Sequence, residues 1–218
     1  MKTFILWIVF LSSAVLHAEK CTQSGQSLAS GGWPRQLRTL CLTESIKINL
    51  FRSPDHRKVI EADIDGFRLI IDGKNALWPD GEEFLANNAE VSWSPTSSAF
   101  FINYGDGSGL DGWTINVFTI QGNRVVDHKE INDRIVRLFR EHIDCSKESV
   151  DPNVRGLGWS RDGTHLFAFA QTTVSEPCGT QGEFRGAVAS LADRSISKFY
   201  SQAEAKQHFH DLLPYNMR

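Results

Sequence analysis

Two segments of this chain gather residue types that bind ligands. The first, residues 105–112, holds four glycines and the carboxylates of Asp106 and Asp111. With the Ser108 hydroxyl, these carboxylates are oxygen donors of the kind that Ca²⁺ takes, although their order is not that of an EF-hand loop, which ends in a glutamate. A flexible connection between two strands accounts for the same glycines equally well. Both interpretations stay open at this stage.

The second segment, residues 172–184, occupies the corresponding place in a later repeat of the sequence. Equivalent loops of a repeated scaffold emerge from the same edge of the array, here called the rim. Binding residues concentrate on loops that a rigid scaffold holds in place. We therefore predict a recognition surface on this rim, without metal or cofactor. The predicted binding residues are Tyr104, Asp106, Asp111, Trp113, Glu176 and Arg185.

Sequence motifs of catalysis are missing from the chain. It contains no H-E-x-x-H zinc motif, no G-x-S-x-G nucleophile elbow and no G-x-x-x-x-G-K phosphate loop, each of which requires its residue types at fixed spacing. We therefore predict no catalytic residue. A hydrolase acting on glycan or peptide stays as an alternative, because serine, histidine and carboxylate side chains can converge from distant positions.

Four cysteines, Cys21, Cys41, Cys145 and Cys178, lie beyond the first 18 residues. An even number of cysteines in an exported chain indicates disulfides, and four cysteines allow three pairings. We favour Cys21 with Cys41 and Cys145 with Cys178, because each pair closes a local loop. Metal ligation is the alternative, but the chain has no C-x-x-C pair.

The first 18 residues have the pattern of a secretory signal peptide. Lys2 precedes an apolar run over residues 4–11, and small residues follow, so cleavage is expected after Ala18 or Ala14. We expect a periplasmic or secreted chain with no retained membrane span and a single domain over residues 19–218. Cleavage leaves 22 basic against 26 acidic side chains, a balance that argues against a nucleic-acid partner.

A repeated pattern dominates the rest of the sequence. Residues 52–59, 93–100 and 159–166 align on a tryptophan or arginine followed by Ser-Pro or Ser-Arg, and the match between the last two extends further along the chain. Such repetition indicates a stacked supersecondary unit. We predict that Trp93 and Trp159 pack in the core at equivalent positions.

Each repeat is expected to contain up to four strands joined by tight turns, because apolar alternation and Pro, Asp, Asn and Gly turn residues mark the breaks. The predicted strands are 46–51, 58–63 and 67–72 in the first unit, 89–93, 98–104, 113–120 and 124–129 in the second, and 155–159, 164–171, 186–192 and 195–200 in the third. Helices are predicted at 80–86, 131–143 and 201–213, with Asn132 and Ser201 as N-caps of the last two.

The basic cluster of the chain falls within the second of these helices. Arg134, Arg137 and Arg140 lie at helical spacing beside acidic neighbours. We interpret them as one solvated helix face.

The segments Trp93-Ser94-Pro95, Trp159-Ser160-Arg161-Asp162-Gly163 and Ser53-Pro54-Asp55 resemble the repeats of the Tol-system periplasmic β-propeller family. The resemblance implies four-stranded blades with the tryptophan between blades. Closed propellers have four to eight blades, and three repeats are found here. We predict a mainly β fold, a small or incomplete β-propeller-like array of antiparallel sheets with short helices between units. A fourth blade from residues 27–42 with the C-terminal end, and a sheet-and-helix sandwich, are the alternatives.

These features together predict an exported, non-enzymatic binding protein of a bacterial periplasm with a protein partner. A second hypothesis is an immunity or inhibitor protein that neutralises a periplasmic toxin or hydrolase. Small size, an even cysteine count and acidic balance agree with that role without selecting it.

Overall fold

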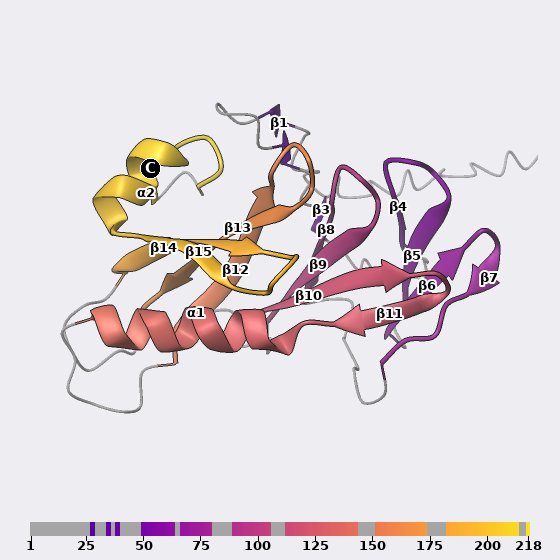
Figure 1. Ribbon diagram of the computed structural model, residues 1–218, viewed down its shortest axis with the longest axis horizontal. Helices are drawn as coiled ribbons and strands as arrows, with labels where there is room; N and C mark the ends of the chain where they lie inside the picture. Colours follow the sequence, from indigo (N-terminus) through magenta and orange to yellow (C-terminus); the bar gives the residue numbers. More distant parts are fainter. Residues whose placement is uncertain are drawn as a thin grey trace, which may run out of the picture.

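Three antiparallel sheets, two of four strands and one of five, stand side by side in the described part of the computed structural model of the chain (Figure 1). The structure describes residues 27–28, 34–35, 38–39, 49–63, 66–79, 89–105, 112–143, 151–173, 182–213 and 217–218. The prediction of a mainly β, propeller-like array is confirmed. All four cysteines and the predicted helix at 80–86 lie outside the described residues.

The strands follow one another in chain order within each sheet. The first sheet contains β4 (Asn49–Arg52), β5 (Lys58–Asp63), β6 (Gly66–Ile71) and β7 (Lys74–Asn75). The second contains β8 (Ala89–Trp93), β9 (Ala99–Tyr104), β10 (Thr114–Gln121) and β11 (Arg124–Asp127). The third contains β12 (Asn153–Trp159), β13 (His165–Gln171), β14 (Phe184–Ser190) and β15 (Ile196–Tyr200).

The two repeated tryptophans fill equivalent positions between successive sheets, as predicted. The indole N–H of Trp93 donates to the backbone carbonyl of Phe51 in the preceding sheet, at 3.0 Å. The indole N–H of Trp159 donates to the carbonyl of Ser92 at 3.4 Å. Phe51 and Ser92 occupy equivalent positions in the repeat. Phe51 directly precedes the Arg-Ser pair of the first unit, and Ser92 directly precedes the Trp-Ser pair of the second. The repeat in the sequence is thus a repeat in three dimensions.

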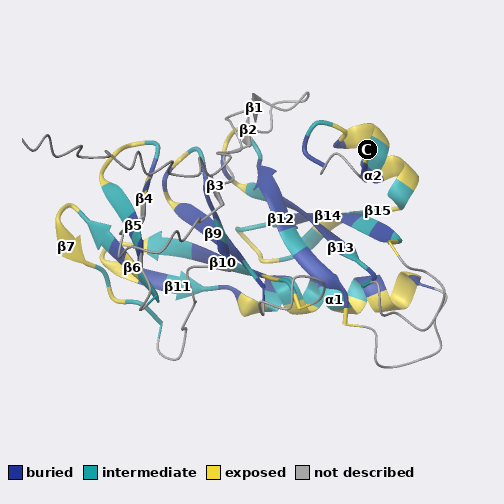
Figure 2. Cartoon of the chain, turned by 180° about the vertical axis from the view of Figure 1, so that it is seen from behind, coloured by how far each residue is buried: buried dark blue, intermediate teal, exposed yellow. Residues whose placement is uncertain are grey.

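Three apolar clusters lie on successive faces of the array, and buried residues concentrate on the facing strands (Figure 2). The first lies between the first and second sheets and includes Phe51, Ile60, Leu69, Trp93, Phe100 and Phe118. The second lies between the second and third sheets and includes Phe101, Ile115, Ile135, Phe139, Trp159 and Leu166. The third covers the far face of the third sheet and includes Leu157, Phe167, Phe169, Phe209, Leu212 and Leu213.

The outer faces of the first and third sheets differ in what covers them. Helix α2 (Gln202–His208) and the residues after it cover the far face of the third sheet, where a further sheet would pack in a longer array. At the other end, Arg52 stands where the later units have tryptophan, and it is exposed. Stacked repeats need terminal units with modified outer faces. The array is therefore open.

The N-terminal strands are short and belong to two sheets. β1 (Ser27–Leu28) and β2 (Pro34–Arg35) form a separate two-stranded sheet, and β2 also lies against β12. β3 (Arg38–Thr39) pairs with β8 and becomes a fifth strand of the second sheet. The described strands within residues 27–42 therefore do not form one four-stranded unit, and the rest of that segment lies outside the described residues.

The hairpin turn that opens each unit has the same hydrogen bonds three times. The N–H of Ser53, Ser94 and Ser160 donates to the carbonyl five residues later, at 2.9, 2.8 and 2.8 Å. The hydroxyl of each serine accepts the N–H of that same residue, at 3.0, 3.0 and 2.9 Å. The fourth turn position is left-handed, with φ of 60° at His56, 58° at Ser97 and 71° at Gly163.

Replacing His56 with glycine is expected to raise the free energy of unfolding by about 0.5 kcal/mol. A left-handed conformation costs a non-glycine residue ~1–2 kcal/mol, whereas the extra freedom of glycine in the unfolded chain offsets ~0.5–1 kcal/mol of that gain. Urea denaturation measures the difference. Ser97→Gly is the matched control: its hydroxyl accepts the N–H of Asp55 at 3.0 Å, so the gain should be cancelled. Equal shifts in both variants would contradict this explanation.

Acid should weaken the turn that begins the third sheet. A hydrogen bond from the Ser160 hydroxyl, followed by bonds from Thr164, lowers the pKa of Asp162 to about 2, and an unfolded aspartate titrates near ~3.9. Folding therefore favours the ionised form of Asp162. The contribution of this carboxylate to the free energy of unfolding is complete above about pH 4 and is lost as the pH falls through about 2. Urea midpoints of wild type and Asp162→Asn should differ at pH 5 and converge toward pH 2. A difference independent of pH would disprove the linkage.

Two helices lie among the residues that the structure describes. Helix α1 (Lys129–His142) begins after His128 instead of at the predicted cap Asn132. The reason is tertiary: a 2.8 Å hydrogen bond between His128 and Thr119 of β10 holds the chain where the helix starts. Helix α2 has Ser201 as N-cap with a full capping box to Glu204, as predicted for Ser201. Its helical part ends at His208, short of the predicted residue 213.

Candidate functional site

The described members of the predicted rim are Tyr104, Trp113 and Arg185; Asp106, Asp111 and Glu176 lie outside the described residues. Tyr104 ends β9 and is half-buried against the first apolar cluster. It pairs with Thr114 of β10, which places it beside the residue after Trp113. No contact between Arg185 and the other two is found in the part of the chain that the structure describes.

Trp113 joins the second sheet to the third. Its backbone N–H donates to the side-chain oxygen of Asn153 at 2.9 Å, and its carbonyl accepts the N–H of Val154 at 2.8 Å. The guanidinium of Arg155 lies 4.3 Å from the centre of the indole ring, a cation–π distance. These contacts tie Trp113 to the first strand of the third sheet.

A polar network continues from Arg155 into the interface of the two sheets. Arg155 forms an ion pair with Glu90 of β8, and Glu90 also accepts a 3.0 Å hydrogen bond from the Asn103 amide. The same amide donates to the carbonyl of Gly156 at 2.9 Å and accepts its N–H at 2.7 Å. Asn103 thus acts as a side-chain link between β9 and β12.

Arg185 is also engaged within the protein. Its guanidinium lies 2.6 Å from a carboxylate oxygen of Glu183 and donates to the carbonyl of His142, at 3.3 Å, at the end of α1. The side chain is 18 % exposed. A cation held in this way stabilises the end of α1.

A hydroxyl, an imidazole and a carboxylate form a row at the start of α1. His128 Nε2 lies 2.8 Å from Thr119 Oγ1, and His128 Nδ1 lies 3.7 Å from a carboxylate oxygen of Glu130. However, His128 is 3 % exposed, and the same Glu130 oxygen lies 3.2 Å from the Arg194 guanidinium. Burial lowers the pKa of His128. The row therefore anchors the helix instead of presenting a nucleophile to solvent.

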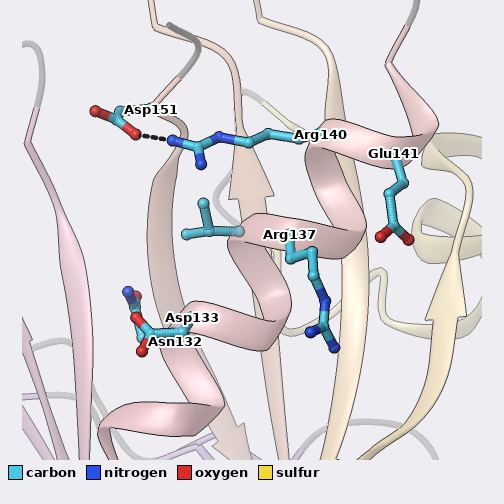
Figure 3. A pocket seen from close by; sticks show the side chains of 7 residues that line it. Asn132, Asp133, Arg137, Arg140, Glu141 and Asp151 are labelled. Carbon is cyan, nitrogen blue, oxygen red and sulfur yellow. Dashed lines mark hydrogen bonds and ion pairs between the residues drawn. The ribbon is translucent and has the colours of Figure 1, made fainter. Parts of the chain in front are cut away.

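A groove of about 600 Å³ on the exposed side of α1 is the strongest candidate site. Helix α1 is amphipathic: Ile131, Ile135 and Phe139 face the second apolar cluster, and charged residues cover the opposite side. The loop entering β12 borders the groove through Asp151. The lining residues are Asn132, Asp133, Val136, Arg137, Arg140, Glu141 and Asp151 (Figure 3).

Two guanidinium groups of the groove differ in their surroundings. Arg140 forms an ion pair with Asp151, and the two side chains are 44 % and 88 % exposed. Arg137 is exposed and makes no ion pair with any residue that the structure describes; Figure 3 shows its guanidinium apart from the Arg140–Asp151 pair. A planar guanidinium without a partner can donate two parallel hydrogen bonds to a carboxylate.

The sequence had placed Arg137 and Arg140 on a solvated helix face, and Arg134 with them. Arg137 and Arg140 are exposed and line the groove, whereas Arg134 is half-buried and lies outside it. The i, i+3 and i, i+4 spacing of Asp133, Arg137, Arg140 and Glu141 was a signal for a shared face. Helical spacing could not predict the position of Asp151, because this residue lies outside α1, just before β12.

No protein family model matches the chain, and no curated protein matches its sequence. The fold alone indicates the class of protein. The described residues form a propeller-like array of antiparallel sheets, and the C-terminal helix covers the outer face of the third sheet. Among the described residues, no group of three or more metal-ligating side chains is found, and neither helix has the length and apolarity that crossing a bilayer requires.

Proposed function

We propose that this chain is an exported, non-enzymatic binding protein of a bacterial periplasm that holds a protein partner against the groove on α1. The observation that carries the proposal is the exposed Arg137 guanidinium, unpaired among the described residues, in a groove beside an exposed ion pair. Arginine is enriched where proteins meet, because its fork recognises carboxylates and carbonyls with defined geometry.

The scaffold beneath the groove supports this role. Three buried residues of α1, Ile131, Ile135 and Phe139, each have 0 % exposure and pack on the second and third sheets. A site carried on a rigid element is positioned more accurately than one on a loop. The groove can therefore bind a partner without ordering the helix first.

The resemblance of the repeats to the Tol-system periplasmic propeller family supports a binding role in the same compartment. The features that the resemblance implies, four-stranded units with Trp93 and Trp159 between them, agree with the arrangement of the sheets. Export further requires that residues 1–18 act as a signal peptide. We expect the chain from the periplasmic fraction to begin at Glu19 or Val15; a full-length chain confined to the cytoplasm would refute export.

Site-specific photo-crosslinking in cells tests the binding role. A photoreactive amino acid replaces Val136, which lines the groove and leaves both arginines in place, and the same replacement at Gln207, exposed on α2, is the control. We expect one discrete crosslinked protein at position 136, weakened by Arg140→Glu and missing at position 207. Identical crosslinks at both positions, or none at position 136, would reject the groove as the binding site.

A further inference from the structure

The charges along the groove have a defined order. In chain sequence, Asp133 is acidic, Arg137 and Arg140 are basic, and Glu141 is acidic again, and all four line the groove. Residues three and four apart on a helix are surface neighbours. The groove therefore presents a basic centre with a carboxylate toward each end of the helix.

Asp151 sits at this basic centre from outside the helix. Its carboxylate pairs with Arg140 while the side chain remains 88 % exposed. Exposed ion pairs contribute little to stability, because water screens them and two long side chains lose freedom. A carboxylate supplied by a partner can therefore replace Asp151 at Arg140 at small cost. Figure 3 shows the Arg137 guanidinium apart from this pair. Arg137 is exposed and lies three residues before Arg140 on the helix, so a rotamer change can bring it to the same carboxylate.

We propose that the groove recognises a peptide segment in which one carboxylate is flanked by cationic side chains, and that Asp151 occupies the carboxylate position in the free protein. This inference rests on the proposed function and names the chemistry of its partner. The ligand carboxylate binds Arg137 and Arg140, and its cationic neighbours face Asp133 and Glu141. The two acidic ends repel a uniformly acidic segment, which gives selectivity.

Two synthetic peptides of seven residues test this order of charges. The first has a central glutamate and a lysine at each end; the second has the reversed pattern, a central lysine and a glutamate at each end. Binding is followed through the side-chain Nε–H signals of ¹⁵N-labelled arginine in the full mature chain. We expect the first peptide to shift the signals of Arg137 and Arg140, with at least fivefold weaker binding of the reversed peptide.

Variants separate the roles of the residues. Asp151→Asn should tighten binding of the first peptide up to about fivefold, the fold-change equivalent of an exposed ion pair. Arg137→Gln should weaken binding at least fivefold. Arg134→Gln is the matched control, since Arg134 lies on the same helix outside the groove, and it should change binding less than twofold.

Three results would overturn the inference: equal binding of both peptides, no tightening in Asp151→Asn, or the same shifts with inorganic phosphate as with the first peptide. The last result would identify a general anion site. Failure here is distinguishable from failure of the proposed function, because crosslinking at position 136 can still capture a partner of different chemistry.

Discussion

Replacing Trp159 with alanine is expected to lower the free energy of unfolding by about 3–5 kcal/mol, the cost of removing a large aromatic side chain from a packed core. The side chain is 0 % exposed, and its ring lies 5.6 Å from that of Phe101 in the preceding sheet. The substitution also removes the N–H that donates to the Ser92 carbonyl. Chemical denaturation measures the loss.

Trp159→Phe is the matched control for this prediction. It keeps an aromatic ring in the interface but removes the indole N–H and part of the volume, so we expect a loss of about 1–2 kcal/mol. If alanine costs no more than phenylalanine, Trp159 does not hold the second and third sheets together. An equivalent result at Trp93, which is 4 % exposed, would extend the conclusion to the first interface.

Asn103→Ala is expected to cost about 2–4 kcal/mol, because it leaves two buried backbone groups without partners, at ~1–3 kcal/mol each. Asn103 is 1 % exposed, and its amide satisfies both the N–H and the carbonyl of Gly156 across the sheet interface. Its second donor bond, to Glu90, is lost as well. Urea denaturation at constant pH tests the prediction.

Asn116→Ala provides the control of the same residue type. The hydrogen bonds of the Asn116 amide, to the Ile102 carbonyl and the Thr114 hydroxyl, are both 3.5 Å long, at the limit for such bonds. We expect a loss below about 0.5 kcal/mol, as for ordinary surface substitutions. Similar losses in both variants would mean that the link between Asn103 and Gly156 contributes little.

Much of the hairpin structure was predictable because its causes are local. β5 and β8 have the predicted bounds, and most other strands differ by one to three residues at an end. Within each opening turn, the serine hydroxyl and the left-handed fourth position involve residues at most five apart. Ser201 was likewise a correct cap, because its capping box with Glu204 needs only three residues of separation.

Other features depended on partners far along the chain. Asn132 was predicted as the cap of α1, but the bond from His128 to Thr119 moves the start of the helix. The predicted rim includes Trp113 and Arg185, and the structure shows contacts of both with other elements: Trp113 with Arg155 of β12, and Arg185 with the end of α1. Polarity and loop position alone do not distinguish such engaged side chains from free ones.

By itself, the amino-acid sequence determined the repeated unit, the turns that join its strands and the apolar face of each helix, since hydrogen bonds and side-chain periodicity over a few residues specify them. Only the tertiary structure decided that α2 and the residues after it cover the outer face of the third sheet, because this requires packing between separate elements. It also decided the groove, where Asp151 meets Arg140 through the path of the chain into β12.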